Sequence, residues 1–230
     1  MKELNRYALI ERKFPREMLL LVGRGCRWSK CTFCDYYNDV HLEPFKMNKE
    51  VLAKVSGRFG VLDVINSGSC FELDAETLAL IKKTAKEKHI HTIWFECHWM
   101  YRDSLEEMRG FFDNIEVKFR LGVETFNHKL RRKWNKGIPK EASVKEIARK
   151  FDGICLLIGI KGQTKHTVRR DIKYSKRYFE YFSVNVFNKN STDTKIDEKL
   201  ISWFKDKIHP KLKKCKNVEI LIKNTDLGLG

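Results

Sequence analysis

Short apolar runs alternate along the chain with longer stretches whose apolar residues recur every three or four positions. The run at 17–23 (EMLLLVG) ends in glycine and predicts a buried strand, and 48–59 has helical spacing. Asp74 is placed to cap a following helix. Further strands are predicted at 61–66, 91–97, 116–123, 153–159, 181–187 and 217–222, and further helices at 75–88, 102–112, 128–137, 140–151, 164–179 and 197–208.

This alternation predicts an α/β fold with a parallel sheet and right-handed crossovers, as an incomplete barrel or an open sheet. No linker, repeat or low-complexity stretch interrupts it, so one domain covering residues 1–230 is expected. In both architectures functional residues gather at the carboxyl ends of the strands. The unusual stretches follow strands in this way, at 25–34, 66–69, 96–99, 122–126, 158–164 and 185–190.

The composition shows a large excess of positive charge, and it also indicates where in the cell the protein is found. Lys and Arg number 46 against 30 Asp and Glu, a net charge of +16 that attracts RNA, acidic proteins or anionic metabolites. The lysines are dispersed, however, so a nucleic-acid partner is not favoured. No apolar run reaches the roughly 18 residues of a spanning helix, and seven cysteines are an odd number for a secreted framework. We expect a cytoplasmic protein with no membrane partner.

Three cysteines lie close together after the first predicted strand, as Cys26, Cys31 and Cys34 in the spacing C-x4-C-x2-C. A thiol–disulfide pair needs no third thiol, and zinc requires a fourth ligand, for which His41 is the nearest candidate. Three thiolates without a fourth suit a 4Fe–4S cluster that leaves one iron open. Zinc and coincidence stay open as alternatives.

With Phe33 directly before Cys34, this segment resembles the signature of the radical S-adenosylmethionine (SAM) enzymes. Their usual spacing is C-x3-C-x2-C, so this chain has one additional residue. The stretches 121–137 and 156–172 also resemble family motifs, with Lys161 where proline is usual, and 181–187 resembles the sixth strand.

The resemblance implies a fold, a cofactor set and a reaction. The fold is a partial (β6/α6) TIM-like barrel with the 4Fe–4S loop after its first strand. The cluster, once reduced, cleaves SAM to a 5′-deoxyadenosyl radical that abstracts hydrogen from an inert carbon. A flavodoxin or ferredoxin is the expected electron donor.

The resemblance also assigns residues to the metal and to SAM. Cys26, Cys31 and Cys34 bind the cluster. Ser67 and Gly68 meet the methionyl amine, although the family often has Gly-Gly-Glu there and this chain has only one glycine. The complete set expected to bind SAM is Phe33, Ser67, Gly68, Glu124, Arg131, Arg132, Gly159, Gly162 and Asn185.

The chain has no second cysteine-rich segment or added module, which suits a small-molecule substrate. Its size, its spacing, FECHW at 95–99 and TDLGLG at 225–230 resemble a short radical SAM lyase. That lyase cleaves a 7-deazaguanine bearing a cyclopentenediol to 7-aminomethyl-7-deazaguanine and a diol-derived product. Glu96 and His98, on one side of a strand by alternation, are the catalytic candidates. The substrate candidates are Tyr37, Glu43, Asn66, Asn224 and Asp226.

Three other functions stay open. A radical SAM enzyme that modifies tRNA would explain the positive charge, and a glycyl-radical activating enzyme would act on a protein partner. A non-enzymatic module that binds zinc or an iron–sulfur cluster is the third.

Overall fold

The computed structural model describes residues 4–230, which form two compact units. The first unit comprises residues 4–29, Tyr36–Phe119 and Leu227–Gly230, and the second comprises Lys30–Asp35 and Arg120–Asp226. The boundary falls inside β5, and the strand order follows the chain from β1 to β8. That residues 1–230 form one domain stays a prediction.

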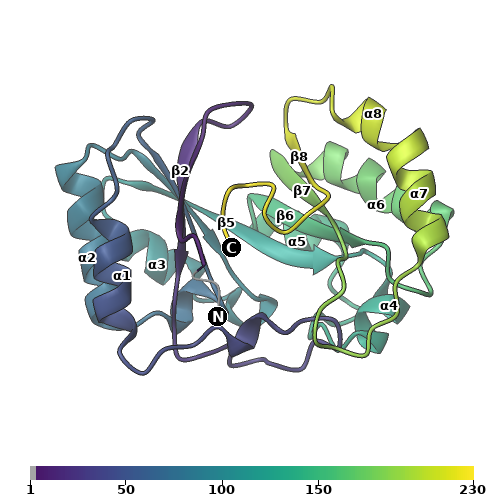
Figure 1. Cartoon of the computed structure of the whole chain (residues 1–230), viewed down its shortest axis with the longest axis horizontal. Helices are drawn as coiled ribbons and strands as arrows, with labels where there is room; N and C mark the ends of the chain where they lie inside the picture. The colour runs from purple at the N-terminus through teal and green to yellow at the C-terminus, as the bar shows by residue number, and fades with distance from the viewer. Residues whose placement is uncertain (1–3) are drawn as a thin grey trace. The chain divides into compact units, whose positions relative to one another are not determined.

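The first unit is built from four strands, the start of a fifth, three α-helices and three short 3-10 helices (Figure 1). The strands are β1 (Tyr7–Ile10), β2 (Arg16–Leu21), β3 (Val61–Asn66), β4 (Thr92–Glu96) and β5 (Glu116–Glu124). The helices are α1 (Pro44–Leu52), α2 (Ala75–Glu87), α3 (Leu105–Phe111), η1 (Tyr36–Asn38), η2 (Cys70–Glu72) and η3 (Trp99–Tyr101).

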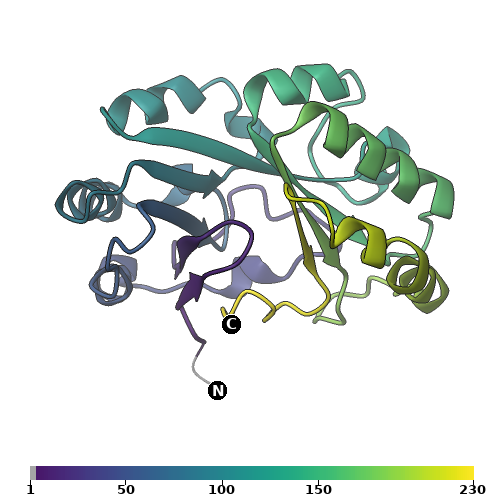
Figure 2. The same ribbon diagram turned by 90° about the horizontal axis from the view of Figure 1, so that it is seen from above.

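Parallel pairing of β2, β3 and β4 forms the centre of the first unit, as the apolar runs predict. Figures 1 and 2 show α1 and α2 side by side, and α1 also packs on β2. Leu62, Val64 and Ile93 are fully buried in these strands. The predicted cap of α2 is confirmed, because Asp74 accepts a hydrogen bond from the backbone N–H of Thr77 at 2.7 Å.

The expectation of a sheet that is parallel throughout is wrong at the amino-terminal end. β1 pairs antiparallel with β2, with Tyr7 opposite Leu19. Three half-buried residues and the exposed Leu9 give too short a hydrophobic pattern for the strand to be recognised in the sequence. The Tyr7 hydroxyl fixes the pair by donating to the buried Glu17 carboxylate at 2.6 Å.

The helix predicted at 48–59 is shifted toward the amino terminus. It begins at Pro44, whose fixed φ and missing N–H suit a first helical position. It ends at Leu52, and the chain beyond it turns toward Glu17. The Glu17 carboxylate accepts hydrogen bonds from the backbone N–H groups of Ser56 at 2.8 Å and Gly57 at 2.7 Å, which a continued helix could not offer.

The second unit contains the end of β5, three further strands and five helices. The strands are β6 (Gly153–Ile158), β7 (Tyr181–Val186) and β8 (Val218–Leu221). The helices are α4 (His128–Lys133), α5 (Val144–Lys150), α6 (Lys165–Tyr178), α7 (Glu198–Lys207) and α8 (His209–Leu212). Strands β5 to β8 pair in parallel, and α6 packs against β6 and β7 (Figure 2).

A buried carboxylate fixes the chain where it leaves β5. Asp171 of α6 accepts hydrogen bonds from the Thr125 hydroxyl at 2.5 Å and from the backbone N–H of Phe126 at 3.2 Å. Burial raises the pKa of Asp171 to about 6, against the opposing effect of these hydrogen bonds. The cluster therefore orients the Glu124–Phe126 turn while holding a carboxyl group whose charge is disfavoured.

No helix within residues 4–230 is both long and apolar enough to cross a membrane. Cytoplasmic location stays a prediction.

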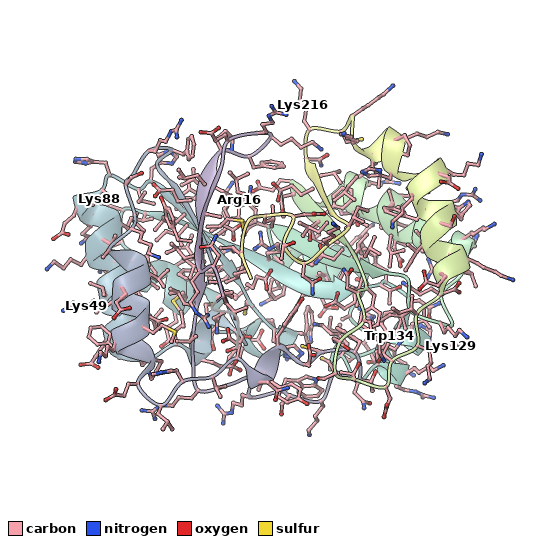
Figure 3. The ribbon with its side chains drawn as sticks, viewed as in Figure 1. Arg16, Lys49, Lys88, Lys129, Trp134 and Lys216 are labelled. Carbon is pink, nitrogen blue, oxygen red and sulfur yellow. The ribbon has the colours of Figure 1, made fainter. Side chains whose placement is uncertain are left out.

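Asn48→Ala tests how β2 is held where it leads into the cysteine segment. The Asn48 side chain accepts from Val22 N at 2.8 Å and donates to Val22 O at 2.9 Å, and both residues are buried. In Asn48→Ala the buried N–H and C=O of Val22 lose their hydrogen bonds, which should lower the free energy of unfolding by about 2–4 kcal/mol, measured by urea denaturation. The control is the exposed neighbour Lys49, labelled in Figure 3. Lys49→Ala should change the free energy of unfolding by less than about 0.5 kcal/mol. Equal stabilities of the two variants would contradict this role.

Asp171→Asn tests the buried carboxyl group through the pH dependence of stability. Between about pH 4 and pH 6 the folded protein retains a proton on Asp171 that the unfolded chain has released. Stability should therefore decrease as pH rises through this window. The free energy of unfolding of wild type minus that of Asp171→Asn should fall across the same window. The exposed Asp206→Asn is the control, and a difference that is flat with pH would refute the raised pKa.

Candidate active site

In the first unit the loop that carries Cys26 is held against the end of β3. A Cβ on Gly68 would overlap Glu72 Oε2 and lie 3.1 Å from the Cα of Cys26, so glycine permits this close approach without displacing the Glu72 carboxylate. Glu72 then ties the loop down, because its carboxylate accepts from Arg27 N at 3.1 Å and Ser69 N at 2.8 Å. The Tyr101 hydroxyl donates to the same carboxylate at 2.9 Å.

Cys26 opens onto a basic pocket of about 430 Å³. Its thiol accepts a long hydrogen bond from Ser29 N at 3.4 Å. The pocket is lined by Arg24, Gly25, Cys26, Arg27, Ser29, Tyr37 and Glu72. Of the predicted substrate residues, Tyr37 is brought next to Cys26 in this way.

Two buried polar atoms at the end of β3 have no hydrogen-bond partner within residues 4–230. They are Asn66 Oδ1 and Ser67 Oγ. The Asn66 amide nitrogen donates to Ser69 O at 3.2 Å, which aims the remaining oxygen elsewhere. An unsatisfied buried oxygen costs free energy unless a ligand or water pairs with it, so both atoms are candidates for ligand contact.

The structure alters the argument for Glu96 and His98. β4 ends at Glu96, so the alternation of faces does not extend to His98. His98 instead precedes η3 as its N-cap, with its Nδ1 accepting from Met100 N at 3.3 Å, and its ring stacks on that of Trp28 with ring centres 5.1 Å apart. An accepting Nδ1 places the proton of the neutral ring on Nε2. His98 is therefore held in a defined orientation, by contacts that the sequence pattern did not indicate.

In the second unit Cys31 and Cys34 lie on one turn, closed by a hydrogen bond from Cys34 N to Cys31 O at 3.2 Å. Phe33, between them, is buried, and its ring packs edge-on against Trp134 with centroids 5.9 Å apart. The apolar cluster beneath the turn is Phe33, Leu130, Trp134, Leu157, Ile160 and Phe187, and both cysteines pack against it. Phe33 thus anchors the turn by packing into this apolar cluster.

Polar contacts from the segment after β7 fix the other side of this turn. Asn190 donates from its side chain to Phe33 O at 2.8 Å, and the Thr194 hydroxyl donates to Thr32 O at 2.7 Å. Ser191 donates to the Asp35 carboxylate from both its backbone N–H and its hydroxyl, each at 2.9 Å. The sequence analysis placed Asn190 in the functional stretch 185–190 but assigned no role to it, and it did not select Ser191 or Thr194, for which the run of Asn, Ser and Thr was the available signal.

Glu124 is engaged in a buried ion pair with Lys136. Lys136 Nζ lies 2.9 Å from Glu124 Oε1, and both side chains are at most 12% exposed. Burial by itself would lower the pKa of Lys136, but the Glu124 carboxylate and the thiol groups of Cys31 and Cys34 raise it above its ordinary value. Lys136 is a site residue that the sequence analysis did not select.

The two arginines of α4 have different surroundings. Arg131 is 2% exposed and donates from Nη2 to Pro139 O at 3.3 Å, and burial lowers its pKa to about 10. Its Nε and Nη1 have no hydrogen-bond partner within the described residues. Arg132 is exposed to solvent. The structure therefore does not group these two side chains.

Gly159 and Gly162 belong to a loop that one side chain organises. Gln163 accepts from Gly159 N at 2.9 Å and Ile160 N at 3.1 Å, and donates to Leu157 O at 2.8 Å. Gly159 has φ of +106°, and a Cβ there would lie 2.6 Å from Ile201. In β7, Asn185 Oδ1 is buried without a partner in the part of the chain that the structure describes.

The remaining predicted substrate residues are exposed. Glu43, just before α1, is exposed, and its backbone N–H donates to His41 Nδ1 at 3.0 Å. Asn224 accepts from Asn188 at 3.2 Å, and Asp226 accepts from Ile222 N at 2.7 Å. Asp226 therefore closes the turn after β8, and Asn224 links this turn to the segment after β7.

No group of three His, Cys, Asp or Glu side chains within residues 4–230 is placed to hold a single metal ion. In a 4Fe–4S cluster each cysteine binds a different iron, so the three thiols do not have to lie close enough together to bind one ion.

No protein-family model and no curated protein sequence matches this chain. Among solved structures, queuine lyase from Clostridium spiroforme bound to SAM and queuine is 42% identical. The alignment covers 99% of this chain and 100% of that one, with a TM-score of 0.95.

Two more distant structures share the fold alone. Methylornithine synthase (PylB) is 16% identical over 98% of this chain and 74% of its own, with a TM-score of 0.55. Streptococcus suis SuiB is 15% identical over 91% of this chain and 50% of its own, with a TM-score of 0.53. The expected α/β class, a partial barrel of the radical SAM type, is confirmed by the queuine lyase match. On 42% identity over essentially the whole of both chains, this protein belongs to the queuine lyase family of radical SAM enzymes.

Proposed function

We propose that this protein is a radical SAM lyase that binds SAM and cleaves queuine. The products are 7-aminomethyl-7-deazaguanine and a product derived from the cyclopentenediol. The observation that carries the proposal is the similarity to a queuine lyase whose structure contains both SAM and queuine, at 42% identity and a TM-score of 0.95.

The three clustered cysteines fit a 4Fe–4S cluster by their chemistry. Cys26, Cys31 and Cys34 are all thiols, partly exposed, and within nine residues of one another in the chain. When bound, a reduced cluster with an open iron supplies the electron that cleaves SAM. The chain's own contribution is to hold these thiols on loops fixed by Gly68 and Glu72 and by Phe33 and Asn190.

Unpartnered buried oxygens fit the polar groups of SAM. We assign Ser67, with Gly68, to the methionyl amine, because Ser67 Oγ is an acceptor without a partner within residues 4–230. Asn185 Oδ1, also unpartnered there, is assigned to the adenosyl group together with Gly159 and Gly162.

The other residues expected to bind SAM have surroundings that favour indirect roles. Phe33 packs beneath the cysteine turn, and Glu124 pairs with Lys136. Arg131 differs from these, because its buried Nε and Nη1 have no hydrogen-bond partner within the described residues, so we keep it as a candidate to bind the SAM carboxylate, whereas Arg132 is exposed to solvent. Direct contact of Glu124 or Arg132 with SAM stays a prediction.

For queuine we assign polar groups of the first unit, which also carries Cys26. Asn66 Oδ1 is an unpartnered acceptor within the described residues, suited to an N–H donor of the base, and Tyr37 lines the pocket with Cys26. His98, fixed by Trp28, can donate from Nε2 to the diol, and Glu96 is the second catalytic candidate. Contacts from Glu43, Asn224 and Asp226 stay predictions.

A one-electron donor of acidic character fits the Cys26 pocket. Arg24 and Arg27 line it beside the proposed cluster ligand, and both are exposed. A reduced flavodoxin or ferredoxin is the class of partner that we propose.

The reaction is tested by incubating anaerobically reconstituted protein with SAM, dithionite and queuine. We expect 7-aminomethyl-7-deazaguanine together with 5′-deoxyadenosine, detected by mass spectrometry. A parallel incubation with tRNA in place of queuine tests whether the net charge of +16 reflects a tRNA substrate. Base product from queuine alone supports the lyase, whereas products only in the incubation with tRNA would refute it.

Cys31→Ala separates cluster binding from the fold. Loss of one of three thiolate ligands should abolish the iron–sulfur absorbance and 5′-deoxyadenosine formation. The control is Cys215→Ala, since Cys215 lies after α8 and outside the cysteine motif. Retained SAM cleavage in Cys31→Ala would show that the cluster assignment is wrong.

A further inference from the structure

The segment after α4 runs along the turn that carries Cys31 and Cys34. Thr32 N donates to Trp134 O at 3.1 Å, and the Cys31 thiol makes a long contact of 3.9 Å with Asn135 O. Trp134, labelled in Figure 3, packs against Phe33. Lys136, which directly follows Asn135, is therefore brought to the cysteine turn by three neighbouring contacts.

The Lys136 ammonium group is held in one place by its surroundings. Nζ lies 2.9 Å from Glu124 Oε1 and 5.8 Å from the centre of the Phe33 ring. The Lys136 side chain is 12% exposed and that of Glu124 is 9% exposed, so solvent screens this charge little.

The backbone is adapted to form this ion pair. Glu124 has φ of +61°, which is unusual for a residue with a side chain, and the register between β5 and β6 shifts between Gly122 and Glu124. A Cβ on Gly122 would lie 2.7 Å from Glu124 Oε1 and 3.0 Å from Lys136 Nζ. The bulge, the left-handed residue and the glycine together make room for one buried ammonium beside two cysteines.

We propose that Lys136 is a positioning residue that raises the reduction potential of the cluster bound by Cys31 and Cys34. This inference rests on the proposed function. Reduction adds one negative charge to a centre that already carries thiolate ligands, and a fixed positive charge nearby stabilises the reduced form more than the oxidised form. Partners outside the ligand sphere are known to tune metal centres in this way.

Glu124 has a complementary role in this arrangement. An isolated ammonium could not be buried here without a large desolvation cost, and the carboxylate offsets that cost. The ammonium group lies 5.8 Å from the centre of the ring of Phe33, the residue before Cys34, so the positive end of Lys136 is at the cysteine turn. In a protein that lacks this carboxylate, the anionic cluster remains as the counter-charge of the buried ammonium, so loss of the Glu124 charge should raise the reduction potential, and removing the ammonium should have the opposite effect.

The test is an EPR-monitored redox titration of the reconstituted protein without SAM. Lys136→Met keeps the length and apolar stem but removes the charge. The equilibrium constant for one-electron reduction should fall about tenfold, which is about 59 mV toward more negative potential. Lys136→Arg should retain most of the wild-type potential, and Glu124→Gln should shift it in the positive direction.

The matched control is Lys129→Met, which removes one positive charge from an exposed position of α4 (Figure 3). Its potential should equal that of wild type, because solvent screens an exposed charge. Unchanged potentials in Lys136→Met and Glu124→Gln, with a cluster bound, would overturn the inference. If Lys136→Met binds no cluster, the sign of the Glu124→Gln shift decides. Wild-type protein that binds no iron would instead refute the proposed function.

Discussion

The attachment of the cysteine loops to the rest of each unit is the constraint on which the proposed chemistry depends. In the second unit the turn from Cys31 to Cys34 rests on Phe33 and is tied by Asn190 and Thr194. In the first unit Gly68 and Glu72 hold the backbone of Cys26 and Arg27. A cluster tolerates little movement of its ligands, so rigid loops lower the cost of organising the site when it forms.

Buried groups without partners complement these rigid loops. Asn66 is the last residue of β3, Ser67 follows it, and Asn185 lies near the end of β7, at places where parallel strands present functional residues. Each retains a buried oxygen unpaired within residues 4–230. Such oxygens destabilise the folded chain on their own, and their retention is reasonable where a ligand supplies the missing hydrogen bonds.

Strand and helix order could be predicted from the sequence, because long apolar periodicities determine it. The apolar run of β6 and the helical spacing of α2 are examples. β1 could not be predicted, because its four residues form a strand only by pairing with β2. The bounds of α1 were predicted wrongly, because the backbone after Leu52 leaves the helix to donate hydrogen bonds to the Glu17 carboxylate. The cysteines were recognisable by spacing. Lys136 was not, because its role depends on a bulge at Glu124 and on packing between segments distant in the sequence.

We propose that, in the cleavage of queuine, the 5′-deoxyadenosyl radical formed from SAM abstracts a hydrogen atom from a carbon of the cyclopentenediol ring. Queuine deuterated on that ring tests it directly, with mass spectrometry of the 5′-deoxyadenosine formed. We predict deuterium in 5′-deoxyadenosine, and no more than a small unlabelled fraction, formed together with 7-aminomethyl-7-deazaguanine. Unlabelled 5′-deoxyadenosine, produced at the same rate with and without queuine, would contradict the account.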